Sequence, residues 1–282
     1  LITKVKMAPL KLFYVASEVA PFAETSTVAI FSQRFSSILN DRTDVDIRLT
    51  KPKYGFISER KYVLREVIRL KEMPVNFGGE DRVVSMKSAF IPETRVQIYF
   101  MEDDQYFKPL PELIYKARNG RIFKDNDERF AFFARVALDT LKRLFWAPDV
   151  LICNDWQMSF IPRLLKEQYK DDPFYANMKT AFFLHSFDDY RMFSKGSYAK
   201  LDLAPEGKGE FLDNVKSAIE HADYVVAIND EKSSLMDDLK ANTEINKIFE
   251  QSQHLVVDLP KNASRSVWVD AANEIEAALR KI

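Results

Sequence analysis

Hydrophobic residues along the chain gather into short apolar runs separated by turn residues, which is the pattern expected of β-strands. These runs are Lys11–Ala16, Val45–Leu49, Val83–Ala89, Val96–Phe100, Val150–Cys153, Thr180–Leu184 and Tyr224–Ile228. Between several of them apolar residues recur every three or four positions, as they do on one side of an α-helix. The chain therefore alternates between predicted strands and predicted helices.

The clearest helical pattern covers Asp127–Phe145, and Pro148 follows its end. An earlier helix is predicted from the spacing of apolar residues that begins at Val28, with Thr25 or Ser26 available as its N-cap. Further helices are predicted at Ser159–Tyr169, Phe211–His221, Glu231–Leu239, Ile245–Phe249 and Val269–Ile282. Helices thus follow or precede most of the predicted strands.

Alternation of this kind predicts an α/β fold of the Rossmann type, with a mostly parallel sheet and helices on both faces. Lys51–Phe107 departs from it, because short alternating strands and a turn at Asn76–Gly79 indicate a small β-rich insertion with hairpins. We expect residues 8–240 to form the Rossmann-like domain. Residues 241–282 are expected to form a helical tail that packs on it, through an apolar stripe that caps the sheet or docks a partner.

Composition narrows the range of partners. The 41 basic and 42 acidic residues leave a net charge of -1, which gives no reason to expect nucleic acid or an anionic membrane as partner. No apolar run approaches the roughly 20 residues needed to span a bilayer. We therefore expect a protein that binds neither nucleic acid nor membrane. The single cysteine fits a reducing compartment, so the cytoplasm is the expected location.

The residues give little reason to expect a metal site or a bound cofactor. The single cysteine, Cys153, excludes an internal disulfide and a cysteine-rich metal site. The histidines at 185, 221 and 254 share no metal-ligand spacing, so no metal is predicted. With seven glycines and no G-x-G-x-x-G motif, the chain does not match a nicotinamide or flavin enzyme, and no cofactor is predicted.

The loop after the first predicted strand reads S-E-V-A-P-F-A-E-T-S-T from Ser17 to Thr27. Bacterial glycogen synthases and plant starch synthases have S-E-V-A-P-F-A-K-T-G-G there, and the chain resembles their N-terminal catalytic domain. Five further stretches carry the resemblance in the family's order: Pro52–Gly55 (P-K-Y-G), Asp125–Phe133 (D-N-x-E-R-F-x-F-F), Pro148–Gln157 (P-D-I-x-H-x-H-D-W-Q), Lys179–Ser186 (K-T-V-F-T-I-H-N) and Ala222–Asn229 (A-D-x-V-T-T-V-S). Together they cover residues 11–240.

The resemblance implies one half of a fold in which two Rossmann-like domains face each other across a cleft. In that family ADP-glucose is held mainly by the C-terminal domain, and the α-glucan enters from the N-terminal one. Retaining glucosyl transfer needs positive charge where the diphosphate leaves. We therefore expect a separately encoded C-terminal half, or another subunit, to complete the cleft.

The resemblance also assigns two candidate catalytic residues. His185 matches a histidine that contacts the donor sugar near the reaction centre; the alternative is a histidine that is hydrogen-bonded at a strand end. Asp155 matches the aspartate of H-D-W, a contact to sugar or acceptor. An equal alternative makes Asp155 the N-cap of a helix that starts near Trp156.

Four other residues are candidates for substrate binding. Trp156 is placed to stack on a sugar, although core packing is the favoured interpretation for an aromatic residue that follows a buried strand. Asn154 stands where the family has a histidine beside Asp155. Glu18 matches a family residue of the first loop, whereas Glu24 replaces the family's lysine.

The changes in the first loop act against phosphate binding. A carboxylate at Glu24 repels a diphosphate, and side chains at Ser26 and Thr27, where the family has glycines, hinder close approach of the backbone. The leading interpretation is a glucosyltransferase that transfers glucose from ADP-glucose to the end of an α-1,4-glucan, impaired or dependent on a partner. The alternative is a catalytically silent domain that binds glucan or a partner. A third reading is an unrelated sugar-nucleotide enzyme with a reshaped cleft.

Overall fold

A ten-stranded mixed sheet runs through the molecule in the computed structural model, which describes residues 8–111, 113–231 and 233–282. Its strands are β1 (Leu10–Val15), β2 (Val45–Pro52), β3 (Arg65–Glu66), β4 (Met73–Phe77), β5 (Glu80–Phe90), β6 (Gln97–Glu102), β7 (Val150–Asn154), β8 (Lys179–Leu184), β11 (Tyr224–Asp230) and β12 (His254–Leu259). Their order is β12-β11-β8-β7-β1-β2-β6-β5-β3, with β4 paired to β5. All strands expected from the apolar runs are present.

The strands from β12 to β6 are parallel, as the alternation of strands and helices predicts. In the register, Tyr14 of β1 lies beside Leu49 of β2 on one side and Ile152 of β7 on the other. Strand β7 is buried along its whole length, which explains its unbroken apolar run. Parallel pairing brings the carboxyl ends of β1, β7 and β8 to one edge of the sheet.

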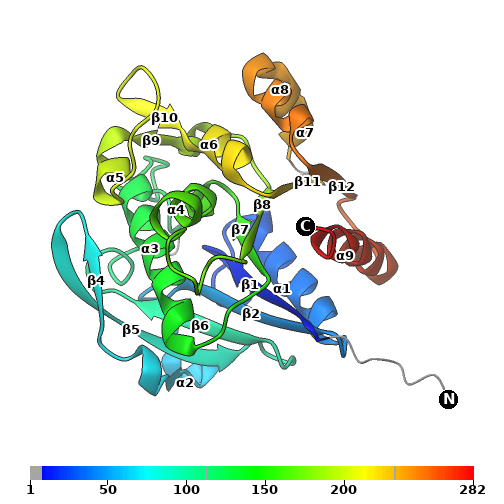
Figure 1. The fold of residues 1–282 in the computed structure, drawn as a ribbon. Helices are drawn as coiled ribbons and strands as arrows, with labels where there is room; N and C mark the ends of the chain where they lie inside the picture. The colour runs from blue at the N-terminus through cyan, green and yellow to red at the C-terminus, as the bar shows by residue number, and fades with distance from the viewer. Residues whose placement is uncertain (1–7, 112, 232) are drawn as a thin grey trace.

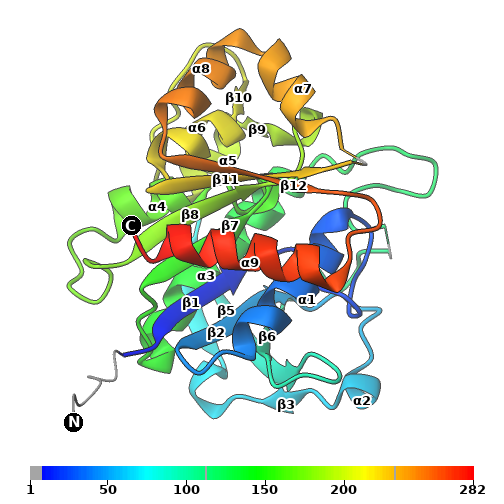
Figure 2. The ribbon, with the colours of Figure 1, turned by 90° about the vertical axis from the view of Figure 1, so that its right-hand side faces the viewer.

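Helices cover both faces of the sheet. They are α1 (Thr27–Asn40), α2 (Glu59–Tyr62), α3 (Asn126–Leu144), α4 (Ile161–Gln168), α5 (Lys195–Lys200), α6 (Asn214–His221), α7 (Leu235–Ala241), α8 (Thr243–Gln251) and α9 (Arg265–Leu279), with short 3₁₀ helices η1 (Ile68–Leu70), η2 (Trp156–Met158) and η3 (Asp189–Arg191). Helices α1 and α9 lie side by side on one face, and α3 and α4 cover the other (Figures 1 and 2). Of the described helices, none is long and apolar enough to cross a membrane.

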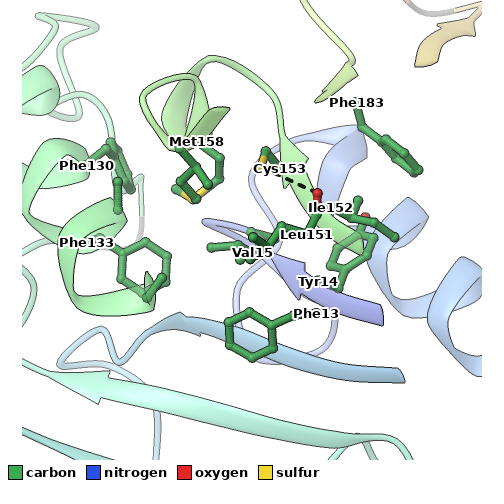
Figure 3. Packing of buried hydrophobic residues seen from close by; sticks show 14 of the residues in the cluster. Phe13, Tyr14, Val15, Phe130, Phe133, Leu151, Ile152, Cys153, Met158 and Phe183 are labelled. Atoms are coloured by element: carbon green, nitrogen blue, oxygen red, sulfur yellow. Dashed lines mark hydrogen bonds between the residues drawn. The ribbon is translucent and has the colours of Figure 1, made fainter. Parts of the chain in front are cut away.

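The core lies between the sheet and these helices. Figure 3 shows Phe13 and Val15 of β1 and Cys153 of β7 among the rings of Phe130 and Phe133 from α3. All five side chains are fully buried, including the Cys153 thiol. Packing on this face holds β1 and β7 together immediately below the ends from which the site residues project.

The β-rich insertion forms as predicted. Strands β4 and β5 pair antiparallel, and the turn between them has Gly78 and Gly79 at φ values of 64° and 79°. Such left-handed backbone at two successive positions is readily adopted by glycine and suits a two-residue hairpin. Strand β5 then pairs antiparallel with β6, which attaches the hairpin to the parallel sheet.

Two expectations from the sequence were wrong in part. The helix expected at Phe211–His221 begins only at Asn214, because its first three residues form strand β10 (Phe211–Asp213), paired with β9 (Met192–Ser194). Asp213 then caps the helix by accepting the backbone N–H of Lys216 at 3.0 Å. The tail 241–282 is not wholly helical, since His254–Leu259 joins the sheet as β12, parallel to β11. This strand is only partly buried, so its apolar run is short.

Candidate functional site

A cleft of about 570 Å³ opens at the carboxyl ends of β1, β7 and β8. Four segments of the chain line it, with the residues Glu24, Thr25, Ser26, Thr27, Val28, Leu113, Tyr115, Lys116, Asp155, Trp156, Gln157, His185, Ser186, Asp188 and Tyr190. Ligand sites of parallel α/β sheets lie at this edge. The structure thus brings Glu24, Asp155, Trp156 and His185 together, whereas Glu18 and Asn154 lie fully buried beneath the cleft surface.

Asp155 links the ends of two neighbouring strands. Its carboxylate accepts the backbone N–H groups of His185 at 3.1 Å and Ser186 at 3.0 Å, and the Ser186 hydroxyl at 2.7 Å. Burial raises the pKa of Asp155 to about 7, although these hydrogen bonds favour the ionised form and oppose the rise. Asp155 therefore holds the turn that carries the His185 side chain.

The N-cap alternative for Asp155 is wrong with respect to its side chain. Asp155 precedes η2, but its carboxylate makes no capping hydrogen bond to that helix. Its backbone has φ 59° and ψ -173°, a region that residues other than glycine rarely adopt. Strain of this kind persists where surrounding contacts enforce it, and here the bonds to His185 and Ser186 do so.

His185 lies in a buried, largely apolar setting at the end of β8. Burial lowers its pKa to about 3, so the imidazole is uncharged at neutral pH. Its ring packs edge-on against Phe31 with centroids 5.0 Å apart, and Nε2 lies 3.4 Å from Oδ1 of Asn154. Asn154 in turn donates through Nδ2 to the carbonyl of Val15 at 3.0 Å, which identifies Oδ1 as the atom facing His185.

These contacts select one tautomer of His185. An amide oxygen only accepts hydrogen bonds, so the proton resides on Nε2 when the ring bonds to Asn154. The Nδ1 atom is then an acceptor, suited to a hydroxyl group. His185 is both hydrogen-bonded at a strand end and part of the cleft wall, so the two interpretations of this residue are compatible.

Glu18 anchors the first loop from inside the protein. Its carboxylate accepts the backbone N–H of Thr25, the hydroxyl of Thr25 at 2.9 Å and the hydroxyl of Ser26 at 3.0 Å. The hydroxyl of Tyr115 donates to the same carboxylate at 2.7 Å. A fully buried group with these partners sets the shape of the loop and has no surface to offer a ligand.

The same network explains how the loop accommodates Ser26. This residue occupies the N-cap position of α1, as predicted, but it makes no side-chain capping bond because its hydroxyl donates to Glu18. Its backbone is extended, at φ -139° and ψ 171°, a conformation that needs no glycine. Glu24, by contrast, is exposed and places its carboxylate on the cleft wall.

A buried lysine lies below this loop. The Lys51 ammonium donates to the carbonyl of Pro52 at 2.7 Å and lies 4.4 Å from the centroid of the Tyr54 ring. Burial lowers the pKa of Lys51 to about 7, and the negative charge of Glu18 partly opposes this shift. The loop therefore rests on a buried carboxyl group and a buried lysine.

Trp156 packs in the core, as favoured from the sequence. Only 3% of its surface is exposed, and its ring lies edge-on to Phe130 with centroids 5.5 Å apart. The ring of Tyr190 stacks on it at 5.1 Å with an interplanar angle of 12°. Tyr190 therefore covers a face of Trp156 and presents its own half-buried ring to the cleft.

Sequence reasoning missed several residues of this site. Tyr115, Lys116 and Tyr190 line the cleft from segments without a regular periodic pattern. Lys51, below the loop, lies near the end of β2, beyond the apolar run that indicates burial of the earlier residues. Within the described part of the chain, no three His, Cys, Asp or Glu side chains gather as metal ligands. The absence of a metal remains a prediction.

Comparison with known proteins agrees with the fold. A family model described as the starch synthase catalytic domain matches residues 11–232. The glycogen synthase of Chlorobium limicola is 32% identical over 220 residues, which are 76% of this chain and 45% of that protein. The glycogen synthase of Pelodictyon phaeoclathratiforme is 29% identical over 273 residues, which are 94% of this chain and 55% of that protein. The chain spans about half the length of the curated relatives it matches.

A solved structure has the same fold. It is the catalytic domain of starch synthase IV from Arabidopsis thaliana, bound to ADP and acarbose, and it matches with a TM-score of 0.71 at 19% sequence identity. The match covers 88% of this chain and 52% of the plant chain. At this level of identity the match shows a common fold.

Proposed function

This chain belongs to the family of starch synthase catalytic domains, and from that premise we propose that its cleft takes part in the transfer of glucose from ADP-glucose to the end of an α-1,4-glucan. The observation that carries the proposal is the pairing of Asp155 with the His185 turn at adjacent strand ends. These are the residues that match the family's site motifs. Their geometry is suited to holding a sugar at the edge of the sheet.

In this proposal His185 is the residue that contacts sugar. Because its imidazole is neutral, it binds a glucose hydroxyl as a hydrogen-bond acceptor and does not neutralise a phosphate. Asp155 acts as a positioning residue, since its carboxylate is engaged with the His185–Ser186 turn. Tyr190 and Lys116 extend the wall along which a glucan would lie.

Most of the positive charge that stabilises the departing diphosphate must come from outside this cleft. Glu24 repels phosphate, and Glu18 is committed to the loop. We propose that a second Rossmann-like unit, on the same polypeptide or on a partner, supplies the remaining cations and closes the cleft.

A specific observation also favours a second candidate function. The exposed Glu24 stands where the family has lysine, so the cleft has lost a cation that would face the donor phosphates. Aromatic and hydroxyl groups such as Tyr190 and Ser186 are unaffected by this change and still suit a glucan. A catalytically silent domain that binds α-glucan is therefore the alternative.

The test is transfer of radiolabelled glucose from ADP-glucose to glycogen by the purified chain, with maltoheptaose binding measured by calorimetry on the same samples. His185→Ala is compared with His221→Ala, because His221 lies on α6, outside the cleft. Transfer that His185→Ala abolishes and His221→Ala preserves supports the glucosyltransferase. Maltoheptaose binding without transfer is expected of the silent domain and equally of a glucosyltransferase that needs a second unit. Absence of both transfer and binding contradicts the two proposals for this chain.

A further inference from the structure

A second pocket of about 360 Å³ lies on the other side of His185. Helix α1 forms one wall through Phe31 and Arg34. The other wall consists of Lys261, in the segment that joins β12 to α9, and Trp268 of α9. We name it the α1–α9 pocket; Figure 2 shows the two helices that flank it. Its volume falls near the lower end of the about 300–1,000 Å³ that small-molecule sites occupy.

Two cations on the walls of this pocket have no anionic partner among the described residues. Neither Arg34 nor Lys261 forms an ion pair with any residue in 8–111, 113–231 or 233–282. The Arg34 guanidinium lies over the Trp268 ring at 5.1 Å, which restrains it while its N–H groups donate to no described residue. The backbone N–H of Lys261 donates to the Glu231 carboxylate at 3.0 Å, so the loop is held while the ammonium stays exposed.

Aromatic rings form the floor between these cations. The Phe31 ring lies 5.8 Å from the Trp268 ring and 5.0 Å from the His185 ring, measured between centroids. The Nε1 atom of Trp268 is buried and has no hydrogen-bond partner among the described residues. Such an unpaired buried donor is rare in a folded protein. Aromatic surface also suits the C–H face of a sugar ring.

The balance of charge specifies the chemistry of the ligand. Arg34 and Lys261 are positive, Asp230 is the one carboxylate among the described lining residues, and His185 is neutral because burial lowers its pKa to about 3. Guanidinium and ammonium groups bind phosphoryl oxygens. A carboxylate and a neutral imidazole instead suit hydroxyl groups. A molecule with both a phosphoryl group and hydroxyls matches this arrangement.

We propose that the α1–α9 pocket binds a phosphoryl group attached to a sugar, with Arg34 and Lys261 on the phosphoryl oxygens and the sugar hydroxyls toward Asp230 and His185. A free sugar phosphate and a sugar nucleotide both carry this group. The inference rests on the proposed function, because His185 lines both the cleft and this pocket. It places the binding cations on α1 and on the β12–α9 segment, which lies beyond the residues that the family model matches.

The test is calorimetric titration with glucose 1-phosphate, ADP-glucose, inorganic phosphate and glucose. The variants are Arg34→Gln and Lys261→Gln, with Arg65→Gln and Lys247→Gln as matched controls, because all four residues are exposed and none forms an ion pair with a described residue. We expect each pocket variant to weaken binding of a sugar-bearing phosphate at least tenfold, and each control to change it by less than twofold. Binding should also weaken as salt is raised.

A second measurement locates the ligand independently of these charges. Trp268 lines this pocket and Trp156 lines the first cleft, so the part of any change in tryptophan fluorescence that arises in the α1–α9 pocket should disappear in Trp268→Phe. Circular dichroism of every variant establishes that it is folded.

The outcomes separate the sources of the phosphoryl group. If the affinity for glucose 1-phosphate depends on Arg34 and Lys261, the ligand is a free sugar phosphate. If only the affinity for ADP-glucose depends on them, the ligand is the sugar nucleotide. Equal affinities in pocket and control variants, or tighter binding of inorganic phosphate than of either sugar compound, would overturn the proposal. Because binding is measured without transfer, failure of glucosyl transfer with binding intact rejects the proposed function and leaves this pocket standing.

Discussion

The carboxylate of Asp155 accepts the backbone N–H of His185 at 3.1 Å, although the two residues are 30 positions apart in the sequence. They meet because β7 and β8 are parallel neighbours whose carboxyl ends lie at the same edge of the sheet. The bond fixes the turn after β8 and, with it, the direction of the His185 ring. The site therefore depends on the pairing of two strands as much as on the two side chains.

Replacement of Asp155 by glycine should be less damaging than replacement by alanine. Both changes remove the acceptor for His185 and Ser186, and unpaired buried donors cost about 1–3 kcal/mol. Only glycine relieves the backbone strain at φ 59°, and relief of such strain is worth on the order of 1–3 kcal/mol. The greater flexibility of glycine in the unfolded chain offsets roughly 0.5–1 kcal/mol of this gain. Urea unfolding should show Asp155→Gly more stable than Asp155→Ala by about 1 kcal/mol.

The exposed Asp189 provides the control, because it is absent from the positive-φ positions. At this position Asp189→Ala should be more stable than Asp189→Gly by roughly 0.5–1 kcal/mol, the reverse of the order at Asp155. The same order at both positions would contradict the assignment of strain to Asp155.

Lys51 should make the folded protein less stable as pH falls from 9.5 toward 7. Its pKa is lowered from 10.5 to about 7 by burial, so in this range the unfolded chain binds more protons than the native state. The free energy of unfolding then rises with pH, by at most about 1.4 kcal/mol per pH unit from this group. Lys51→Met should remove that slope in denaturant titrations between pH 7 and 9.5.

The exposed Lys247 is the matched position, and Lys247→Met should retain the wild-type slope. Parallel pH profiles for wild type and Lys51→Met would show that Lys51 is not the titrating group.

His185 should lower the free energy of unfolding as pH falls below 6.5. Burial lowers its pKa from 6.5 to about 3, so between these values the unfolded chain takes up a proton that the native state does not. Stability from this group is fully present above pH 6.5 and is lost as pH falls toward 3. In His185→Gln the free energy of unfolding should fall less between pH 6.5 and 4 than in wild type, by on the order of a few kcal/mol.

Above pH 7.5 the slopes of wild type and His185→Gln should coincide, since His185 is neutral in both states there. A difference between them that persists above pH 7.5 would assign the effect to altered packing against Phe31 and not to titration.

Glu24→Lys should strengthen binding of ADP to the cleft. The change replaces an exposed negative charge on the cleft wall with a positive one, which is worth about 1 kcal/mol at a solvated site and corresponds to roughly fivefold in affinity. Calorimetry in low salt measures it, and the gain should shrink at physiological ionic strength, where the Debye length is about 8 Å.

Glu250 on α8 offers the same charge reversal away from the cleft. An equal gain in Glu250→Lys would attribute the effect to net charge. No gain in Glu24→Lys would separate this loop from phosphate binding.

Local patterns were sufficient for most elements. The unbroken apolar run of β7 reflects burial on both faces, and the many apolar residues of α3 reflect burial around most of its circumference. Strand β12 was missed because it lies at the sheet edge, where partial exposure shortens the apolar run. The turn at Gly78 and Gly79 was predictable because its backbone favours glycine.

The sequence by itself determined the alternation of strands and helices, the edge of the sheet that holds the cleft, and the positions of Asp155 and His185 at strand ends. Only the tertiary structure decided that Glu18 faces inward, that Asp155 holds the His185 turn, and that Arg34 and Lys261 line one pocket. The physical reason is the distance along the sequence between the residues that interact. Burial and turn preferences act between near neighbours and leave a periodic trace, whereas contacts between distant residues depend on strand order and helix placement, which local patterns do not record.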